Sequence, residues 1–324
     1  MKNPIARIKY KMVLSWVLKV LVVQFILINI SAAFHAYKLT HFYDDDKVRN
    51  LKPSSGTFFL RTWRLMVGKK YPKSLIQYYP PGIYDTVQFS TRKGINIEGW
   101  WMKADSSIGT VILFHGLANN KSAVLDEAYE FLSMGYNTLL IDARAHGNSS
   151  GRASSIGVKE GEEVKLAFDR VKSMGEKNII LWGMSMGAVM ITKAIDEYKI
   201  SPQKIILEMP FARLQDHFRA RARVLGFPDE PFAFFVTCWT GIEQGYWGFS
   251  HKTTSYVKSV KCPVLLQWGA LDAYVLRKET TNIFKNISSG QKTLVVYEQA
   301  GHQSLLGADA EKWKSSVNFF LQVH

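Results

Sequence analysis

The sequence predicts an α/β fold in which helices cover a mostly parallel, doubly wound sheet. Apolar, β-branched runs alternate with helix-like runs along most of the chain, which is typical of parallel strands joined by right-handed crossovers. Apolar residues make up 47% of the 324 residues, enough for a large core. A glycine-flanked serine at 183–187 lies between a strand-like and a helix-like run, as expected for a very tight turn.

The expected elements follow one another in regular order after a long N-terminal segment. Strands are expected at 86–91, 96–103, 110–114, 138–142, 178–183, 204–208, 263–268 and 292–297. Helices are expected at 121–133, 158–173, 186–198, 274–286 and 309–322. The alternation is interrupted at 211–260, where we expect an insert in a domain that spans 81–324.

The first 37 residues are predicted to form a membrane anchor. Residues 12–37 are dominated by apolar side chains and, as a helix, are long enough to cross a bilayer. Residues 1–93 carry 16 Lys and Arg against 4 Asp and Glu, whereas the rest of the chain holds 25 basic and 23 acidic side chains. Because the basic excess adjoins the apolar segment, we expect a membrane surface as its partner and no nucleic acid.

A cleaved signal peptide is the alternative to an anchor, because Ser31-Ala32-Ala33 is small enough for peptidase cleavage. The apolar region exceeds a usual signal core, which favours the anchor. The basic residues before the span lie closer to it than those after it, which favours a cytoplasmic N-terminus and a non-cytoplasmic domain. Residues 38–80 are predicted to be a basic connector, in which Trp63 and its apolar neighbours pack on the membrane or on the domain.

Ser185 is the candidate nucleophile. A serine between Gly183 and Gly187, on a turn from strand to helix, has its hydroxyl lifted clear of the sheet edge. Helix N-capping is the ordinary alternative role for such a serine. The nucleophile interpretation is favoured because the chain also supplies an acid and a histidine in a matching order.

Asp272 and His302 are the candidate acid and base. Asp272 follows the strand expected at 263–268 and His302 follows the strand expected at 292–297, so both lie at carboxyl ends of strands. Serine, then acid, then histidine is the chain order that a serine on this kind of turn requires. The alternatives are Asp142 and Glu208 for the acid, and His115, His146 and His217 for the base.

These motifs resemble those of the α/β-hydrolase family, over about residues 78–322. The chain looks most like membrane-anchored bacterial hydrolases of the serine-aminopeptidase-like, S33-type branch. The motifs that carry the resemblance are, in order, 81–84, 94–101, 115–116, 142–151, 183–187, 269–272 and 301–302.

The resemblance implies a serine hydrolase that cleaves an ester, thioester or amide through an acyl-enzyme. Ser185, His302 and Asp272 would be its catalytic triad. The backbone N–H groups of Met186 and Leu117 would form the oxyanion hole. We expect no metal and no cofactor, because the histidines are scattered and the chain has no glycine-rich phosphate loop.

The insert at 211–260 is expected to be a helical cap over Ser185. Ten of the 39 residues at 211–249 are aromatic, and they either line an acyl pocket or form the buried faces of cap helices. Four arginines are expected on a solvated helix face, with lipid headgroups or an acidic substrate as the alternative contact. They are Arg213, Arg219, Arg221 and Arg223.

Hydrolysis of a carboxylic ester, from a small-molecule or lipid-like acyl substrate, is the expected function. An aminopeptidase or amidase of the same fold is the first alternative, although the acidic residues of the insert show no pattern for gripping an amine. A catalytically silent, membrane-tethered interaction protein is the alternative from another class. Cys238 and Cys262 permit one disulfide and demand none.

Overall fold

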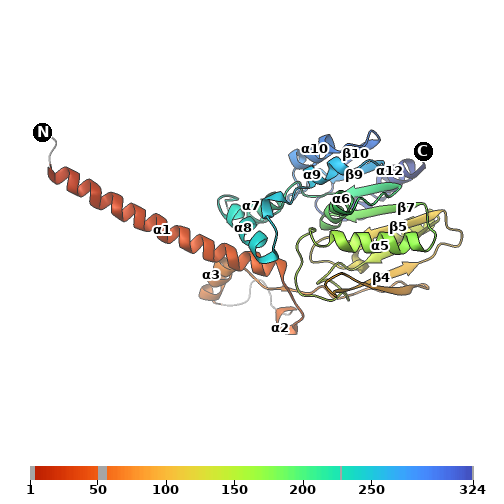
Figure 1. Cartoon of the computed structure of the whole chain (residues 1–324), viewed down its shortest axis with the longest axis horizontal. Helices are drawn as coiled ribbons and strands as arrows, with labels where there is room; N and C mark the ends of the chain where they lie inside the picture. Colours follow the sequence, from red (N-terminus) through yellow and green to blue (C-terminus); the bar gives the residue numbers. More distant parts are fainter. Residues whose placement is uncertain (1–3, 50–56, 227, 323–324) are drawn as a thin grey trace.

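The computed structural model describes residues 4–49, 57–226 and 228–322, and an eight-stranded sheet lies at its centre (Figure 1). The strand order is β10-β9-β8-β7-β5-β6-β4-β3, parallel except where β4 pairs with β3 and β6. The strands are β3 (Asp85–Ser90), β4 (Asn96–Met102), β5 (Gly109–Phe114), β6 (Tyr136–Ile141), β7 (Ile179–Met184), β8 (Lys204–Glu208), β9 (Val264–Gly269) and β10 (Lys292–Tyr297). The predicted α/β class and mostly parallel sheet are confirmed.

Helices lie on both faces of this sheet, as its doubly wound order requires. In β5, Val111 and Leu113 belong to one buried cluster, whereas Ile112 and Phe114 belong to a second. Because successive side chains of a strand point to opposite faces, each face of the sheet has its own core. The helices are α4 (Leu125–Ser133), α5 (Gly161–Ser173), α6 (Met186–Tyr198), α9 (Thr253–Tyr256), α10 (Arg277–Asn286), α11 (Leu305–Ala308) and α12 (Ala310–Gln322).

Two helices begin later than the sequence predicts, because buried carboxylates hold the preceding turns. The helix expected from 158 begins at Gly161, since the Glu160 carboxylate accepts hydrogen bonds from the backbone N–H groups of Ser155 and Gly157. The helix expected from 274 begins at Arg277, since Asp272 occupies the N–H groups of the two residues that would start it. Local side-chain hydrogen bonds thus compete with the first helical turn.

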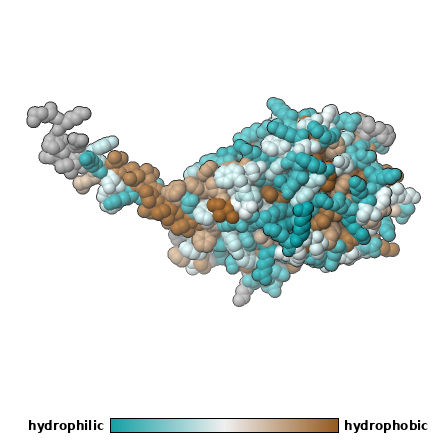
Figure 2. Space-filling model, in the orientation of Figure 1, coloured by the Kyte–Doolittle hydropathy of each residue, from teal (hydrophilic) through white to brown (hydrophobic). Residues whose placement is uncertain are grey.

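The long N-terminal helix α1 (Pro4–Thr40) projects from the rest of the molecule (Figure 1). Its segment Tyr10–Thr40 is long and apolar enough to cross a membrane, and its outer part is exposed and brown in Figure 2. The last turns are different, because Ala32 and Ala36 are fully buried against the cap helix α8 (Phe232–Gln244). The exposed apolar segment and the turns that pack on the domain therefore belong to one continuous helix.

Between α1 and the sheet, the described part of the chain forms four short elements, of which α3 contacts α1. They are β1 (Phe42–Tyr43), α2 (Asp46–Arg49), α3 (Phe58–Val67) and β2 (Tyr71–Pro72). Trp63, on α3, is 55% exposed, so its ring is not buried in the domain. Lys2 and Lys52, two of the basic residues counted above, lie outside the described residues. The domain boundaries drawn from the sequence remain a prediction.

A buried ion pair fixes the turn after β6. The side chains of Lys121 and Asp142 are both fully buried and in contact, and the Lys121 ammonium also lies 3.0 Å from Glu98. The Asp142 carboxylate further accepts hydrogen bonds from the backbone N–H groups of Lys121 and Asn148, at 2.7 and 2.8 Å. Asp142 is therefore fully engaged in holding this turn.

Replacing Asp142 with Ala should destabilise the protein by about 3–5 kcal/mol, because a buried ammonium then loses its main partner. Asp105→Ala, at an exposed loop position, is the control and should change the free energy of unfolding by less than about 0.5 kcal/mol. Denaturant unfolding of the full chain in detergent measures both. Equal stability of the two variants would show that the ion pair contributes little.

Candidate active site

Ser185 lies on a strained turn between β7 and α6. Its backbone has a φ of 53° and a ψ of −115°, a region that residues with a side chain rarely adopt. A Cβ on Gly183 would lie 2.6 Å from the Gly187 carbonyl carbon, and one on Gly187 would lie 2.1 Å from the carbonyl oxygen of Phe114. Both glycines are thus required where β5, β7 and α6 meet.

His302 connects the hydroxyl of Ser185 to a buried carboxylate. Its Nε2 lies 3.0 Å from Ser185 Oγ, and its Nδ1 lies 2.7 Å from Asp272 Oδ2. The Asp272 side chain is fully buried, and its other oxygen accepts hydrogen bonds from the N–H groups of Tyr274 and Val275 at 2.7 and 2.8 Å. This geometry suits proton transfer from the hydroxyl to Nε2, while the carboxylate holds Nδ1–H.

The three side chains come from strand ends on the same edge of the sheet, as its parallel order predicts. Ser185 follows β7, Asp272 follows β9, and His302 follows β10, all at carboxyl ends. The N–H of Ser185 also donates to the backbone oxygen of Glu208, at the end of β8, over 2.7 Å. The turn that carries the hydroxyl is therefore tied to the neighbouring strand.

The alternative acids are committed to other contacts. Asp142 pairs with Lys121, as described above. Glu208 Oε1 accepts hydrogen bonds from the indole N–H groups of Trp182 and Trp313, at 3.1 and 2.7 Å. Burial raises the pKa of the Glu208 carboxyl to about 8, so this group is mostly neutral at pH 7 and unsuited to stabilising an imidazolium.

The histidines His115 and His146 brace the loop that precedes α4. His115 Nε2 accepts a hydrogen bond from the N–H of Ala143 at 3.1 Å, and His146 Nε2 accepts one from Ala118 at 3.0 Å. Burial lowers both pKa values, that of His146 to about 3, so both rings are neutral acceptors. They hold the turn at Gly116, beside Ser185. These contacts give the two histidines a structural role in the loop.

His217, the remaining alternative base, lies in the cap on α7 (Leu214–Val224). Its Nε2 accepts a hydrogen bond from Arg221 Nε at 3.1 Å, and its ring centre lies 5.2 Å from that of Phe211, with the rings tilted by 47°. Burial and the Arg221 charge hold the pKa of His217 well below its usual range. Of the histidines considered from the sequence, His302 lies within hydrogen-bonding distance of Ser185.

The two expected oxyanion donors lie on different segments near Ser185, one of them the residue that follows it and the other the residue after Gly116. Met186 follows Ser185 directly and begins α6, and Leu117 lies in the loop braced by the two histidines. A helix N-terminus directs its free N–H groups toward negative charge. The assignment of Leu117 and Met186 as oxyanion donors remains a prediction.

The sequence analysis missed a buried loop that supports Met186. Ser154 Oγ lies 3.7 Å from the Met186 sulfur and 2.9 Å from the Glu160 carboxylate. The cap reaches the same loop, because Tyr246 OH donates to the Ser155 carbonyl at 3.1 Å and His251 Nε2 lies 2.9 Å from the Ile156 carbonyl. In the sequence, Ser154, Ser155 and Glu160 only weakly indicate this loop, because the cap residues that contact it lie about ninety positions away.

The cap arginines pair mainly with acids of the same insert. Asp216 accepts from Arg213 and Arg219, at 2.7 and 3.1 Å, and Arg219 also contacts Glu230 at 2.6 Å. Arg223 pairs with Asp229 at 3.6 Å, and Arg221 lies over the ring of Tyr71. These charges stabilise the cap itself.

The cap aromatics divide between buried and exposed positions. Phe232, Phe235, Trp239 and Tyr246 pack against the core. Phe234 and Trp247 are 45% and 66% exposed. Packing therefore accounts for the first group and leaves the second on the surface.

No group of three His, Cys, Asp or Glu side chains in the described part of the chain could hold a metal ion. Cys238 and Cys262 are free thiols.

Gly187→Ala should destabilise the protein by about 3 kcal/mol or more, because the new methyl group collides with the backbone of Phe114 rather than with a movable side chain. Gly290→Ala is the matched control, since a Cβ there has nothing within 4 Å, and it should stay within about 0.5 kcal/mol of wild type. Thermal unfolding in detergent separates the two. A well-tolerated alanine at 187 would contradict the required contact between β5 and α6.

Comparison with known proteins identifies similar hydrolases and uncharacterized relatives. A family model described as serine aminopeptidase, S33, matches residues 105–230. The uncharacterized protein YqkD of Bacillus subtilis is 26% identical over 235 residues, which cover 70% of this chain and 76% of that one. Lysophosphatidylserine lipase ABHD12 of Xenopus tropicalis is 25% identical over 201 residues, 57% of this chain and 49% of the lipase.

Among solved structures, the Pyrococcus furiosus esterase Pf2001 is similar with a TM-score of 0.64 and 26% identity, over 78% of this chain and 97% of the esterase. The chain has an α/β-hydrolase fold, and these similarities point to a hydrolase enzyme.

Proposed function

We propose that this protein is a membrane-anchored serine esterase with Ser185, His302 and Asp272 as its catalytic triad. The observation that carries the proposal is the continuous pair of contacts from Ser185 Oγ to His302 to Asp272, at 3.0 and 2.7 Å. An esterase among the similar structures and a lipase among the relatives support an acyl ester as the substrate class.

The reaction proceeds in two halves. His302 Nε2 takes the proton of Ser185 as Oγ attacks the acyl carbonyl, and the N–H groups of Met186 and Leu117 bind the resulting oxyanion. His302 then gives the proton to the leaving alcohol, which leaves an acyl-enzyme. A water molecule, deprotonated by His302, attacks the acyl group; the acid departs and Ser185 regains its proton. Asp272 orients the imidazole throughout and stabilises its charged form.

The cap offers little support for gripping a substrate amine. Asp216, Asp229 and Glu230 are engaged by arginines of the cap. An aminopeptidase would need such carboxylates directed at its substrate, so the ester is the preferred substrate.

Ser185→Ala should abolish labelling by a fluorophosphonate probe and lower kcat for p-nitrophenyl esters by about 10⁶-fold, because the nucleophile is gone. Ser173→Ala, at an exposed serine, is the control and should react like wild type. Esters of graded chain length, assayed beside aminoacyl-arylamides, give the substrate preference.

Three other outcomes would each contradict a different part of this proposal. Full labelling of Ser185→Ala would move the nucleophile elsewhere. Faster turnover of the arylamides would favour the aminopeptidase. A wild-type protein that neither labels nor hydrolyses any ester would be a silent interaction protein on a hydrolase scaffold.

We further propose that α1 is an uncleaved anchor that places the domain on the non-cytoplasmic side. The apolar segment Tyr10–Thr40 supports an anchor, and its last turns pack on α8, a contact that a cleaved peptide would forgo. An alkaline phosphatase fused after residue 322 should be active, because that reporter folds only after export. Activity of a cytoplasmic reporter at the same position would reverse the orientation. Release of the domain from membranes in a shortened form would indicate cleavage.

A further inference from the structure

The exposed apolar surface of α1 does not end where the helix reaches the domain. Residues 10–27 are exposed along the helix, and apolar side chains remain exposed at Ile30, Phe34 and Tyr37, beside the cap. Figure 2 shows the brown surface of the helix running up to the body of the molecule. The apolar surface that would contact lipid is therefore continuous with the side of the cap.

The short helix α3 is fixed beside this junction. Ser31 Oγ donates to the backbone oxygen of Met66, His35 Nε2 lies 3.0 Å from the Leu65 oxygen, and Lys38 Nζ donates to the Gly68 oxygen at 3.0 Å. These contacts use the carbonyl groups at the end of α3.

Most of the described apolar side chains of α3 remain uncovered, although Val67 at its end is buried. Phe59 is 73% exposed and Trp63 is 55% exposed. An amphipathic helix with exposed aromatic rings, held beside a spanning helix, is typical of the boundary between headgroups and acyl chains. This places the bilayer boundary near residues 31–38 of α1.

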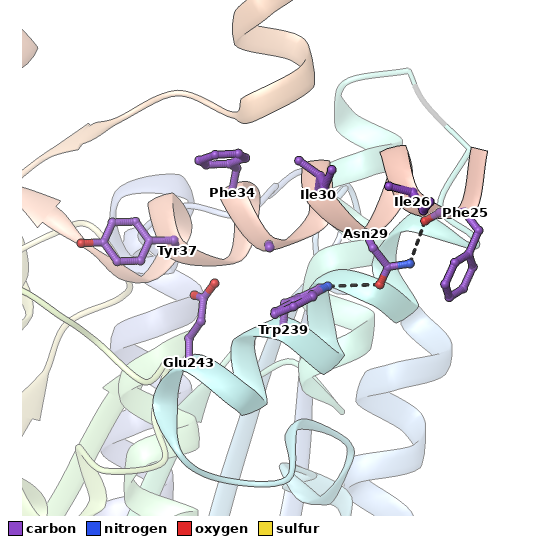
Figure 3. Close-up of a pocket in the computed structure, with 9 residues that line it drawn as sticks. Phe25, Ile26, Asn29, Ile30, Phe34, Tyr37, Trp239 and Glu243 are labelled. Atoms are coloured by element: carbon purple, nitrogen blue, oxygen red, sulfur yellow. Dashed lines mark hydrogen bonds between the residues drawn. The ribbon is translucent and has the colours of Figure 1, made fainter. Parts of the chain in front are cut away.

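A groove of about 750 Å³ runs between α1 and α8 at this level (Figure 3). Its volume lies within the range of about 300–1,000 Å³ that is usual for ligand sites. From Phe25 to Tyr37 its α1 wall extends about 18 Å, at 1.5 Å per residue. The lining residues are Phe25, Ile26, Asn29, Ile30, Ala33, Phe34, Tyr37, Trp239 and Glu243.

The polar groups of the groove are arranged unevenly along it. Asn29 Oδ1 accepts the indole N–H of Trp239 at 3.2 Å, and its Nδ2 donates to the Phe25 oxygen at 2.8 Å, so this amide is satisfied within the wall. Glu243 lies at the other end, with its carboxyl directed toward α1 near Tyr37 (Figure 3). Its Oε2 is buried and has no hydrogen-bond partner among the described residues.

The apolar and polar ends of the groove are oriented as the acyl chain and the ester region of a lipid in the adjoining leaflet would be. The apolar end, at Phe25 and Ile26, lies on the side of the exposed span, and the carboxyl lies on the side of the domain. Burial raises the pKa of Glu243 to about 7, so its protonated form can donate a hydrogen bond to an ester or hydroxyl oxygen. A buried group without a partner is costly, and such an oxygen would relieve that cost.

We propose that the groove between α1 and α8 binds one acyl chain of a membrane lipid from the leaflet that adjoins the domain, with the ester region of that lipid at Glu243. The occupant is a lipid because the groove opens onto the surface that α1 and α3 place in the bilayer. This binding does not require Ser185 to be the nucleophile.

The test is photo-crosslinking of the full chain in phosphatidylcholine vesicles. The Ser185→Ala background prevents consumption of the probe, a phosphatidylcholine with a diazirine in the half of one ester-linked acyl chain that is nearer the ester. Peptides are mapped by mass spectrometry after irradiation. We expect labels on α8 at Trp239 as well as on α1, and no labels on α12, on the far side of the domain.

Two substitutions on α1 provide the matched comparison. Ile30→Trp fills the groove and should reduce the α8 label to the level of α12, while the label on residues 12–22 persists. Val22→Trp adds the same bulk at a similarly exposed position that does not line the groove, and it should leave both labels unchanged.

The proposal is overturned if α8 carries no label in the parent chain, or if Ile30→Trp leaves that label undiminished. Because the parent chain alone decides the first point, misfolding of a variant cannot rescue the proposal. An unlabelled groove in a chain that chemical crosslinking shows to be dimeric through α8 would assign the surface to a second copy instead. If the wild-type chain shows no esterase activity but α8 is labelled, the proposed function is refuted and the lipid-binding groove is not.

Discussion

The close contact of Gly187 with the carbonyl group of Phe114 is the constraint on which the rest of the site depends. It lets α6 start against the end of β5, and this forces the strained backbone of Ser185 and lifts its hydroxyl above the sheet. The same turn is held from the other side, since Ser185 N–H donates to Glu208. A strained residue persists only when its surroundings over-determine it, and here three adjacent strands do so.

Several titratable groups near Ser185 are buried in their neutral forms. His115 and His146 are neutral acceptors of backbone N–H groups, and Glu208 is a largely neutral carboxyl between two indoles. These groups resemble catalytic residues in the sequence, yet they act as positioning elements around Ser185. By contrast, Asp272 accepts hydrogen bonds from the backbone N–H groups of Tyr274 and Val275 and contacts His302 Nδ1.

The N-terminal helix, the cap and the loop that holds Ser154 and Ser155 form a connected series of contacts. The Thr40 carbonyl accepts the N–H of Ser154, whose hydroxyl lies against the Met186 sulfur. The cap reaches the neighbouring residue Ser155 through Tyr246, two residues after α8. Packing between α1 and the cap is therefore linked, through few residues, to the start of α6.

The sequence by itself determined the alternating α/β architecture, the tight turn at Ser185 and the order of the three candidate side chains, because each is written in local periodicity, in glycine spacing or in chain order. Helix starts at Gly161 and Arg277 were missed, since buried carboxylates compete for the N–H groups of the first turn. Only the tertiary structure decided that His302, rather than His217, reaches Ser185, that the cap arginines pair with neighbouring acids, and that a groove lies between α1 and α8. Those outcomes depend on contacts between residues far apart in the chain, and neither periodicity nor spacing records such distances.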